Sequence, residues 1–157
     1  MENQELTEKI IGCAYRVYNK MGFGFLESVY EKCLMIELKK TGLSAESQVP
    51  IHVEYAGEVV GDFLADILVE GVVILELKSV KRIVRAHEIQ LVNYLTATQK
   101  ELGLILNFSE TKVEVKRKVR DLKRLAGGTG GRFTMVLEDE TMLSGEDWET
   151  YVEERNE

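Results

Sequence analysis

At 157 residues, with 45% hydrophobic and 30% charged residues, the chain has the composition of an ordinary globular protein with one domain-sized core. No apolar stretch approaches the length of a membrane span, which excludes a membrane-spanning protein. The polar, acidic N-terminus is not a signal peptide, and both cysteines fall in apolar helical patterns typical of reduced core thiols. We therefore expect a cytoplasmic protein without a membrane partner.

The net charge of −7 is unevenly distributed along the chain. Residues 127–157 hold nine acids and two arginines, which accounts for the whole net charge and leaves residues 1–126 neutral overall. Residues 112–124 carry seven basic side chains against two acidic ones. A second, smaller basic cluster consists of Lys81, Arg82 and Arg85. Such clusters suit phosphate contacts, although a solvated charged face is their commoner meaning.

The hydrophobic pattern, taken in chain order, predicts two amphipathic helices followed by a mixture of strands and one further helix. The first two helices cover residues 6–21 and 26–40, and Gly22-Phe23-Gly24 separates them. Strands follow at 49–55, 58–69 and 72–78, then a helix at about 84–99 and strands at 102–108 and 112–119. This order indicates an α/β or α+β fold, with a small mixed sheet flanked by helices.

A glycine-rich segment, residues 127–131, is the one clear linker. We expect a folded domain over residues 1–126, and a linker with an acidic C-terminal tail over residues 127–157. Residues 132–137 could add a short strand. A disordered solubilising tail, or a locally added strand and helix, is the commoner meaning of such a segment. The acidic tail could instead lie over the basic surface of its own chain as a phosphate mimic, or bind a partner.

The strongest chemical signal is Asp66, followed ten residues later by Glu76-Leu77-Lys78. The run Val72-Val73-Ile74-Leu75 leads directly into Glu76 and is typical of a buried central strand. Side chains alternate across a strand, so Glu76 and Lys78 share one face while Leu75 and Leu77 share the other. Charges there are costly unless they are paired or hold a metal.

The turn around Glu70-Gly71 decides whether Asp66 and Glu76 meet. With a two-residue turn, Asp66 lies opposite Leu75 and the two acids face apart. With a three-residue turn or a bulge at Gly71, Asp66 lies opposite Glu76. We predict the second register, with Asp62, farther along the strand of Asp66, as the competing carboxylate.

Two carboxylates with bound waters and substrate phosphates form the ligand set that Mg²⁺ prefers. Such a cation lowers the pKa of a water molecule and neutralises charge that develops on a phosphate. Lys78 could orient or activate the water, or stabilise the pentavalent phosphorus. A buried ion pair between Lys78 and one of the acids, without catalysis, explains the same three residues equally well.

Two further motifs lie on the predicted helices. Gly24-Phe25-Leu26-Glu27-Ser28-Val29-Tyr30 opens the second helix, where Glu27 suits the helix dipole. His87, Gln90 and Tyr94 form a polar stripe along the third helix. For His87 and for His52, which is alone in a strand, an ordinary hydrogen-bonded histidine is a better explanation than a metal ligand.

With these motifs the chain resembles the GxxExxY family within the PD-(D/E)xK nuclease superfamily, from about Leu6 to Arg120. The resemblance is carried by Gly-Phe-Leu-Glu-Ser-Val-Tyr-Glu-Lys-Cys-Leu, Ala-Asp-Ile-Leu-Val-Glu, Leu-Glu-Leu-Lys-Ser-Val, His-Glu-Ile-Gln-Leu-Val-Asn-Tyr-Leu and Leu-Gly-Leu-Ile-Leu-Asn-Phe. It implies a restriction-endonuclease-like core and a Mg²⁺ or Mn²⁺ site for phosphodiester hydrolysis. Ala65 stands where the superfamily motif has a proline before the aspartate.

The resemblance also implies roles for individual residues. Asp66, Glu76 and the Leu77 carbonyl would hold the metal, and Lys78 would position the attacking water. Glu27 would support the metal through water, and Gln90 and Tyr94 would line the site. From the two basic clusters, and not from the resemblance, we expect phosphate contacts by Lys81, Arg82, Arg85, Lys116, Lys118 and Arg120.

The function that we expect is therefore a metal-dependent nuclease acting on DNA, with RNA as a second substrate class. Cutting both strands of a duplex with one site per chain would require a homodimer. The alternative is a non-catalytic nucleic-acid-binding or protein-binding module that retains the nuclease fold.

Overall fold

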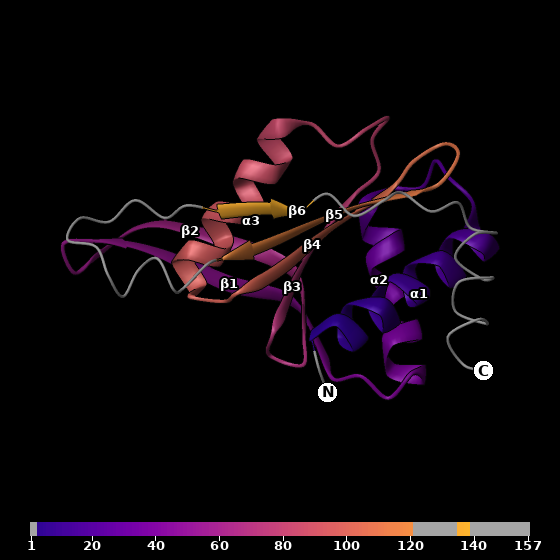
Figure 1. Cartoon of the computed structure of the whole chain (residues 1–157), viewed down its shortest axis with the longest axis horizontal. Helices are drawn as coiled ribbons and strands as arrows, with labels where there is room; N and C mark the ends of the chain where they lie inside the picture. Colours follow the sequence, from indigo (N-terminus) through magenta and orange to yellow (C-terminus); the bar gives the residue numbers. More distant parts are fainter. Residues whose placement is uncertain (1–2, 121–134, 139–157) are drawn as a thin grey trace.

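The computed structural model of the chain describes residues 3–120 and 135–138 (Figure 1). Its three helices are α1 (Asn3–Met21), α2 (Glu27–Lys40) and α3 (Arg85–Thr98). Its strands are β1 (Ala45–Tyr55), β2 (Glu58–Val69), β3 (Val73–Lys78), β4 (Leu102–Phe108), β5 (Val113–Arg120) and β6 (Met135–Glu138). The element order expected from the sequence is confirmed. The predicted glycine linker and most of the acidic tail lie outside the described residues.

The strands form one mixed sheet in the order β1-β2-β3-β4-β5-β6. The β3–β4 pair is parallel, because α3 forms the crossover between these strands, and the other pairs are antiparallel. β3 and β4 therefore occupy the centre of the sheet, as the continuous apolar pattern of both strands predicts. The predicted mixed sheet flanked by helices is confirmed.

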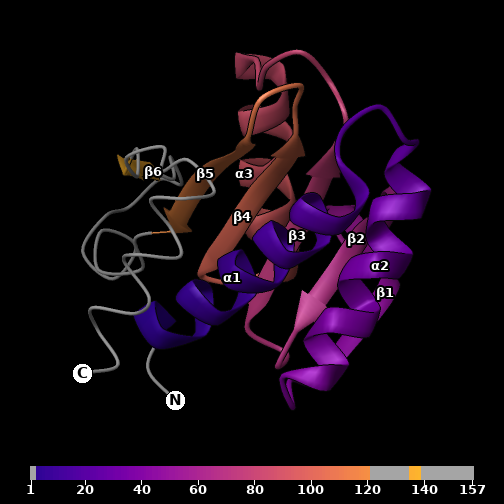
Figure 2. The ribbon, with the colours of Figure 1, turned by 90° about the vertical axis from the view of Figure 1, so that its right-hand side faces the viewer.

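Helices cover both faces of the sheet (Figure 2). α1 and α2 pack on one face, where Leu75 and Leu77 of β3 join their apolar side chains in one buried cluster. α3 packs on the other face, where Ile74 of β3 joins Leu91 and Leu95 of α3 in a second cluster. The even-numbered residues of β3 thus face α3, which puts Glu76 and Lys78 on the α3 side, on the face opposite to Leu75 and Leu77 as expected.

Two strands differ in extent from the sequence prediction. β1 begins at Ala45, four residues earlier than predicted, because Glu46, Ser47 and Gln48 are polar and exposed and give no apolar alternation. β6 covers Met135–Glu138, within and just beyond the predicted strand at residues 132–137. In the described part of the chain, no helix is both long and apolar enough to cross a membrane.

Candidate functional site

The turn between β2 and β3 has the predicted looser register. Val69 pairs with Val73, so Glu70, Gly71 and Val72 form a three-residue turn. Glu70 and Gly71 both have positive φ, +54° and +65°, and the glycine adopts this conformation without steric cost. Ile67 pairs with Leu75. The next pair along the two strands is therefore Asp66 and Glu76, as predicted, and not Asp66 and Leu75.

The two acids replace ladder hydrogen bonds at this point of the sheet. The Leu77 N–H donates to Oδ2 of Asp66 at 2.7 Å, and the Asp66 N–H donates to Oε1 of Glu76 at 3.4 Å. The regular pairing of β2 with β3 ends one residue earlier, at Ile67 and Leu75. The carboxylates are thus held by the backbones of both strands, and their remaining oxygen lone pairs are available to a further ligand.

Burial is the main electrostatic feature of this pair. Glu76 is only 5% exposed, and this burial, followed by the charge of Asp66, raises the pKa of its carboxyl from 4.5 to about 8. Burial also raises the pKa of Asp66, although the Leu77 N–H and Lys78 both lower it. Burial thus disfavours the charged forms of both carboxyls, and a bound cation would offset this cost.

Lys78 lies next to both acids and is partly buried. Its positive charge lowers the pKa of Glu76 and of Asp66, but by less than burial raises either of them. No salt bridge within 4.0 Å joins it to either acid in the described residues. The purely structural ion pair considered from the sequence is therefore not formed.

The loop before α2 brings Glu27 toward this pair. Gly24 has φ of +100°, which only glycine adopts readily, and it allows the chain to turn into α2, whose first residue is Glu27. The Tyr30 hydroxyl donates to the Gly22 carbonyl at 2.6 Å, and the Tyr30 ring stacks on Phe108 with 4.2 Å between ring centroids. Glu27 is exposed and its charge raises the pKa of Glu76. Of this motif, Gly24 and Tyr30 hold the loop, and Glu27 lies close enough to Glu76 to raise its pKa.

Two side-chain contacts fix the end of β3 against its surroundings. The Ser79 hydroxyl donates to the Phe25 carbonyl at 2.8 Å, which ties the loop before α2 to the residue after Lys78. The Asn107 side chain forms a hydrogen-bond pair with the backbone N–H and carbonyl of Val80, each at 3.0 Å. The sequence offers no pattern by which these two supporting residues could have been found.

Gln90 and Tyr94 approach the site from α3. Gln90 Nε2 donates to the Tyr94 hydroxyl at 3.0 Å, as their spacing on one helix face predicts. Burial, then the charges of Glu76 and Asp66, raises the pKa of Tyr94. His87 does not join them, because its Nδ1 accepts from the Val84 N–H at 3.1 Å at the start of α3.

Two residues near the acids were not among the candidates. Glu31, one turn after Glu27 on α2, has a raised pKa, caused first by burial and also by the charge of Asp66. Gln48 of β1 donates from Nε2 to Oε2 of Glu31 at 2.9 Å, and its side chain lowers the pKa of Asp66. Gln48 lies in the polar start of β1 that the sequence pattern missed.

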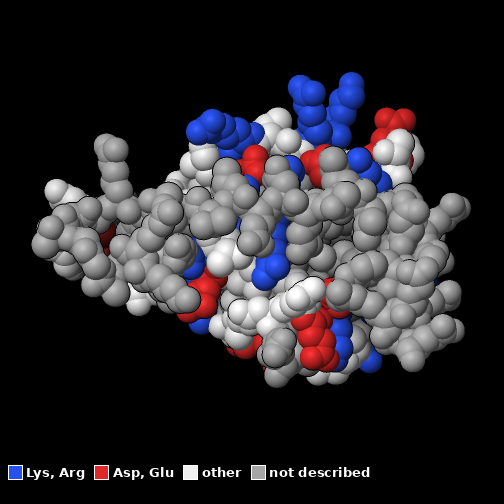
Figure 3. All heavy atoms as spheres, in the orientation of Figure 1, with Lys and Arg blue, Asp and Glu red and all other residues white. Residues whose placement is uncertain are grey.

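The candidate phosphate contacts divide into two groups. Lys81, Arg82 and Arg85 are exposed in and beside the segment between β3 and α3, and Lys116 is partly exposed on β5. Lys and Arg side chains gather along the edge of the molecule at which α3 begins (Figure 3). These positions are accessible to a nucleic acid.

Lys118 and Arg120 do not fit the predicted role. Lys118 is 0% exposed and its Nζ lies 2.7 Å from Oε1 of Glu88. Arg120 is 7% exposed and donates to the carbonyls of Lys100 and Gln99, which follow the end of α3. Both side chains stabilise the packing of α3 against β5, and neither is open to phosphate.

The donor set of the site suits a hard divalent cation. Among the residues described, no three or more His, Cys, Asp or Glu side chains enclose a metal position. Two carboxylates, with the remaining positions left to water and phosphate oxygens, are nevertheless the ligands that Mg²⁺ takes from proteins that bind it together with a phosphorylated substrate. Asp66 and Glu76 therefore fit Mg²⁺ or Mn²⁺, and do not fit a structural zinc site.

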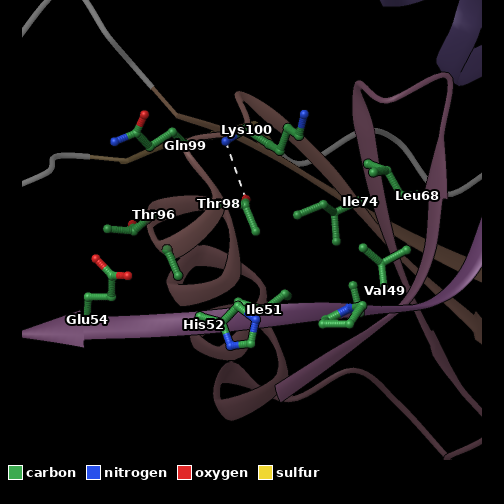
Figure 4. Close-up of a pocket in the computed structure, with 13 residues that line it drawn as sticks. Val49, Ile51, His52, Glu54, Leu68, Ile74, Thr96, Thr98, Gln99 and Lys100 are labelled. Carbon is green, nitrogen blue, oxygen red and sulfur yellow. Dashed lines mark hydrogen bonds between the residues drawn. The ribbon is translucent and has the colours of Figure 1, made fainter. Parts of the chain in front are cut away.

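A separate pocket of about 650 Å³ lies between β1 and the C-terminal end of α3 (Figure 4). It is lined by apolar residues including Ile51 and Ile74, and by polar groups from Thr96 to Lys100. None of the candidate site residues lines it. His52 borders the pocket and pairs with Asp62 on β2, so the competing carboxylate belongs to an exposed cross-strand pair and not to the site.

A family model described as the PD-(D/E)XK nuclease superfamily matches residues 4–118, well over half of the chain. No curated protein and no solved structure matches the chain.

Proposed function

We propose, since this chain belongs to the PD-(D/E)XK nuclease superfamily, that it hydrolyses phosphodiester bonds in DNA with Mg²⁺ or Mn²⁺. The observation that carries the proposal is the register of the β2–β3 hairpin, which puts Asp66 beside Glu76 on the face that also carries Lys78. The motif Gly24-Phe25-Leu26-Glu27-Ser28-Val29-Tyr30 supports a place within the GxxExxY family of this superfamily.

We assign the cation to Asp66, Glu76 and the Leu77 carbonyl. A bound Mg²⁺ supplies a water of lowered pKa and neutralises negative charge on the phosphate that is attacked. Lys78 donates hydrogen bonds on the same face, where it orients the water and stabilises charge on the phosphate. Glu27 would accept hydrogen bonds from water bound at the site, and Gln90 and Tyr94 border the site on the α3 side.

We propose that the substrate binds at the exposed basic edge, which consists of Lys81, Arg82 and Arg85. Lys81, Arg82 and Arg85 begin three residues after Lys78, so a phosphate backbone that crosses the site also meets them. Lys116 is the remaining contact of the predicted group. Binding through phosphates gives affinity without base recognition, which suits a nuclease of low sequence specificity.

Three further assignments are proposals about assembly, the tail and location. Cleavage of both strands of a duplex by one site per chain requires two copies, and we propose a homodimer for that reaction.

The acidic segment after residue 126 competes with nucleic acid for the basic edge or binds a partner. A truncation after Ala126 tests the competition, because nucleic-acid affinity equal to that of the full chain contradicts it.

The third proposal is a cytoplasmic location, which the free thiols of Cys13 and Cys33 suit.

The proposed function is tested by metal-dependent cleavage. Supercoiled plasmid, linear duplex, single-stranded DNA and RNA are incubated with the full chain and Mg²⁺ or Mn²⁺, with and without a chelator. We expect cleavage that the chelator stops and that Asp66→Asn and Glu76→Gln each abolish. Asp62→Asn is the matched control, since it changes an exposed carboxylate on the same strand and leaves cleavage intact.

The same assay separates the alternative function. Nucleic-acid binding that survives chelation, with no cleavage of any of these substrates under either metal, contradicts the nuclease proposal and supports a non-catalytic binding module. Cleavage by Asp66→Asn at the native rate contradicts the assignment of the metal site.

A further inference from the structure

Gln48 lies opposite Asp66 on the neighbouring strand, in an unusual backbone conformation. Ser47 pairs with Ile67 and Val49 pairs with Ala65, so Gln48 and Asp66 occupy the position between these two pairs. They are absent from the regular pairing, and φ of Gln48 is +53°. This left-handed conformation is uncommon for a glutamine, because its Cβ crowds the backbone. Its free-energy cost must be offset by interactions nearby.

At the same position in β1 and β2, the side-chain alternation is broken, so residues on either side of it point to opposite faces of the sheet. Residues two apart on a regular strand share a face. In β2, however, Ile67 packs with the α1 and α2 cluster whereas Ala65 packs with the α3 cluster. In β1, Ala45 packs against the first cluster and Val49 against the second. Asp66 is therefore held where both of its neighbouring strand pairings are interrupted, on the β1 side and on the β3 side.

The Gln48 side chain connects two acids at this interruption. Its Nε2 donates to Oε2 of Glu31 on α2 at 2.9 Å, and the same side chain lies close enough to the Asp66 carboxyl to lower the pKa of that group. A glutamine NH₂ carries two hydrogens, so one amide group can serve both carboxylates. The amide is neutral and therefore orients the acids without cancelling the negative charge that a cation needs.

We propose that Gln48 is a positioning residue of the metal site: its amide holds the Asp66 carboxylate in the orientation that binds the cation, and Glu31 holds Gln48. This inference rests on the proposed function, since it concerns the same cation. Lysine or arginine at this position would compete with the cation, and a shorter side chain would not reach from the left-handed backbone of β1 to α2. The strained conformation is thus the means by which β1 supplies a donor to both acids.

A purely structural role for Gln48 predicts a different outcome. If its left-handed conformation only shapes the β1–β2 hairpin, substitutions change stability and leave metal affinity unchanged. Gln48→Ala removes the amide and keeps the strain, whereas Gln48→Gly removes both. Gln99, which also has a positive φ of +58° and follows α3, is the matched control.

The experiment measures Mn²⁺ affinity by calorimetry and metal-free thermal unfolding on the full chain. We expect Gln48→Ala and Gln48→Gly each to weaken Mn²⁺ binding by about 10- to 100-fold, the range seen when a group that orients a metal ligand is lost. The glycine variant should unfold at a higher temperature than the alanine variant. Gln99→Ala should bind Mn²⁺ with native affinity. Glu31→Gln, whose amide oxygen still accepts from Gln48, should lose less affinity than Glu31→Ala.

Asp66→Asn distinguishes failure of this inference from failure of the proposed function. If Asp66→Asn loses Mn²⁺ binding while both Gln48 variants keep native affinity, the role of Gln48 is overturned and the metal site stands. If the native chain binds no Mn²⁺ and cleaves no nucleic acid, the proposed function fails. It also fails if Asp66→Asn binds Mn²⁺ and cleaves nucleic acid as well as the native chain does. In either case this inference fails with it.

Discussion

The backbone N–H of Leu77 donates to Oδ2 of Asp66 at 2.7 Å, so the aspartate of β2 is held by the strand that carries Glu76 and Lys78. This hydrogen bond takes the place of a ladder bond between the two strands. The site is therefore built into the sheet and does not depend on a flexible loop, which gives its acids fixed positions before any ligand arrives.

Glu76 should make the stability of the metal-free protein depend on pH. Its folded pKa of about 8 lies above the ordinary value of 4.5, so the folded state keeps a proton that the unfolded state releases between these pH values. The free energy of unfolding should therefore fall as pH rises through this window, by roughly 5 kcal/mol over the whole window. Glu76→Gln should lose most of this slope. Urea unfolding with a chelator between pH 5 and pH 9 measures it, and parallel pH profiles for the two proteins would refute the argument.

Metal binding should release a proton at pH 7. With a pKa of about 8, Glu76 is mostly protonated at that pH, and a carboxylic acid must lose its proton to bind a cation. Calorimetric heats in two buffers of different ionisation enthalpy should give about one proton released per Mn²⁺. Affinity should also rise with pH up to about 8. Tight binding whose heat is the same in both buffers would count against protonated Glu76.

Lys78→Ala should abolish cleavage without loss of metal binding. Lys78 is partly buried and forms no salt bridge with either acid in the described part of the chain. Its removal therefore breaks no ion pair with Asp66 or Glu76. The cleavage rate should fall by about 10²- to 10⁴-fold, while Mn²⁺ affinity and melting temperature stay near native. Lys39→Ala, an exposed lysine in the last turn of α2, is the control. Cleavage by Lys78→Ala at the native rate would remove Lys78 from the mechanism.

The basic edge should govern how salt weakens DNA binding. Replacing Lys81, Arg82 and Arg85 with alanine should lower the slope of log affinity against log salt by roughly 0.9 for each lost phosphate contact. Lys118→Ala provides the contrast, since it leaves Glu88 without its buried partner. It should cost about 2 kcal/mol of stability and leave the salt slope unchanged. Binding titrations at several salt concentrations, with urea unfolding, measure both effects; an unchanged slope in the triple variant would exclude this edge.

Gly103 should be sensitive to any side chain. A Cβ at this position of β4 would come within 2.7 Å of Leu91 on α3, closer than carbon atoms approach. Gly103→Ala should destabilise the protein by about 1–3 kcal/mol, because α3 must shift away from the sheet. Leu91→Ala should rescue part of that loss in the double variant, which a double-mutant cycle detects. Purely additive effects would show that α3 is not held by this contact.

The local patterns of the sequence predicted most elements within a few residues. They also singled out Asp66 and Glu76, which the structure brings side by side. The start of β1 was missed because residues 46–48 are polar, and Gln48 was missed with it. The basic character of β5 was read as an exposed surface, although Lys118 is buried against Glu88. A run of charges does not reveal which of its members another element covers.

The sequence by itself determined the order of helices and strands, because hydrophobic spacing is a property of neighbouring residues. It also determined that two acids and a lysine lie within segments whose apolar residues predict strands. Only the tertiary structure distinguished a three-residue turn from a bulge in the hairpin, and only it showed that Glu76 is buried enough to raise its pKa to about 8. It also revealed that Gln48 contacts Glu31 beside Asp66. These features depend on which segments pack together, and the resulting distances and burial arise between residues far apart in the chain.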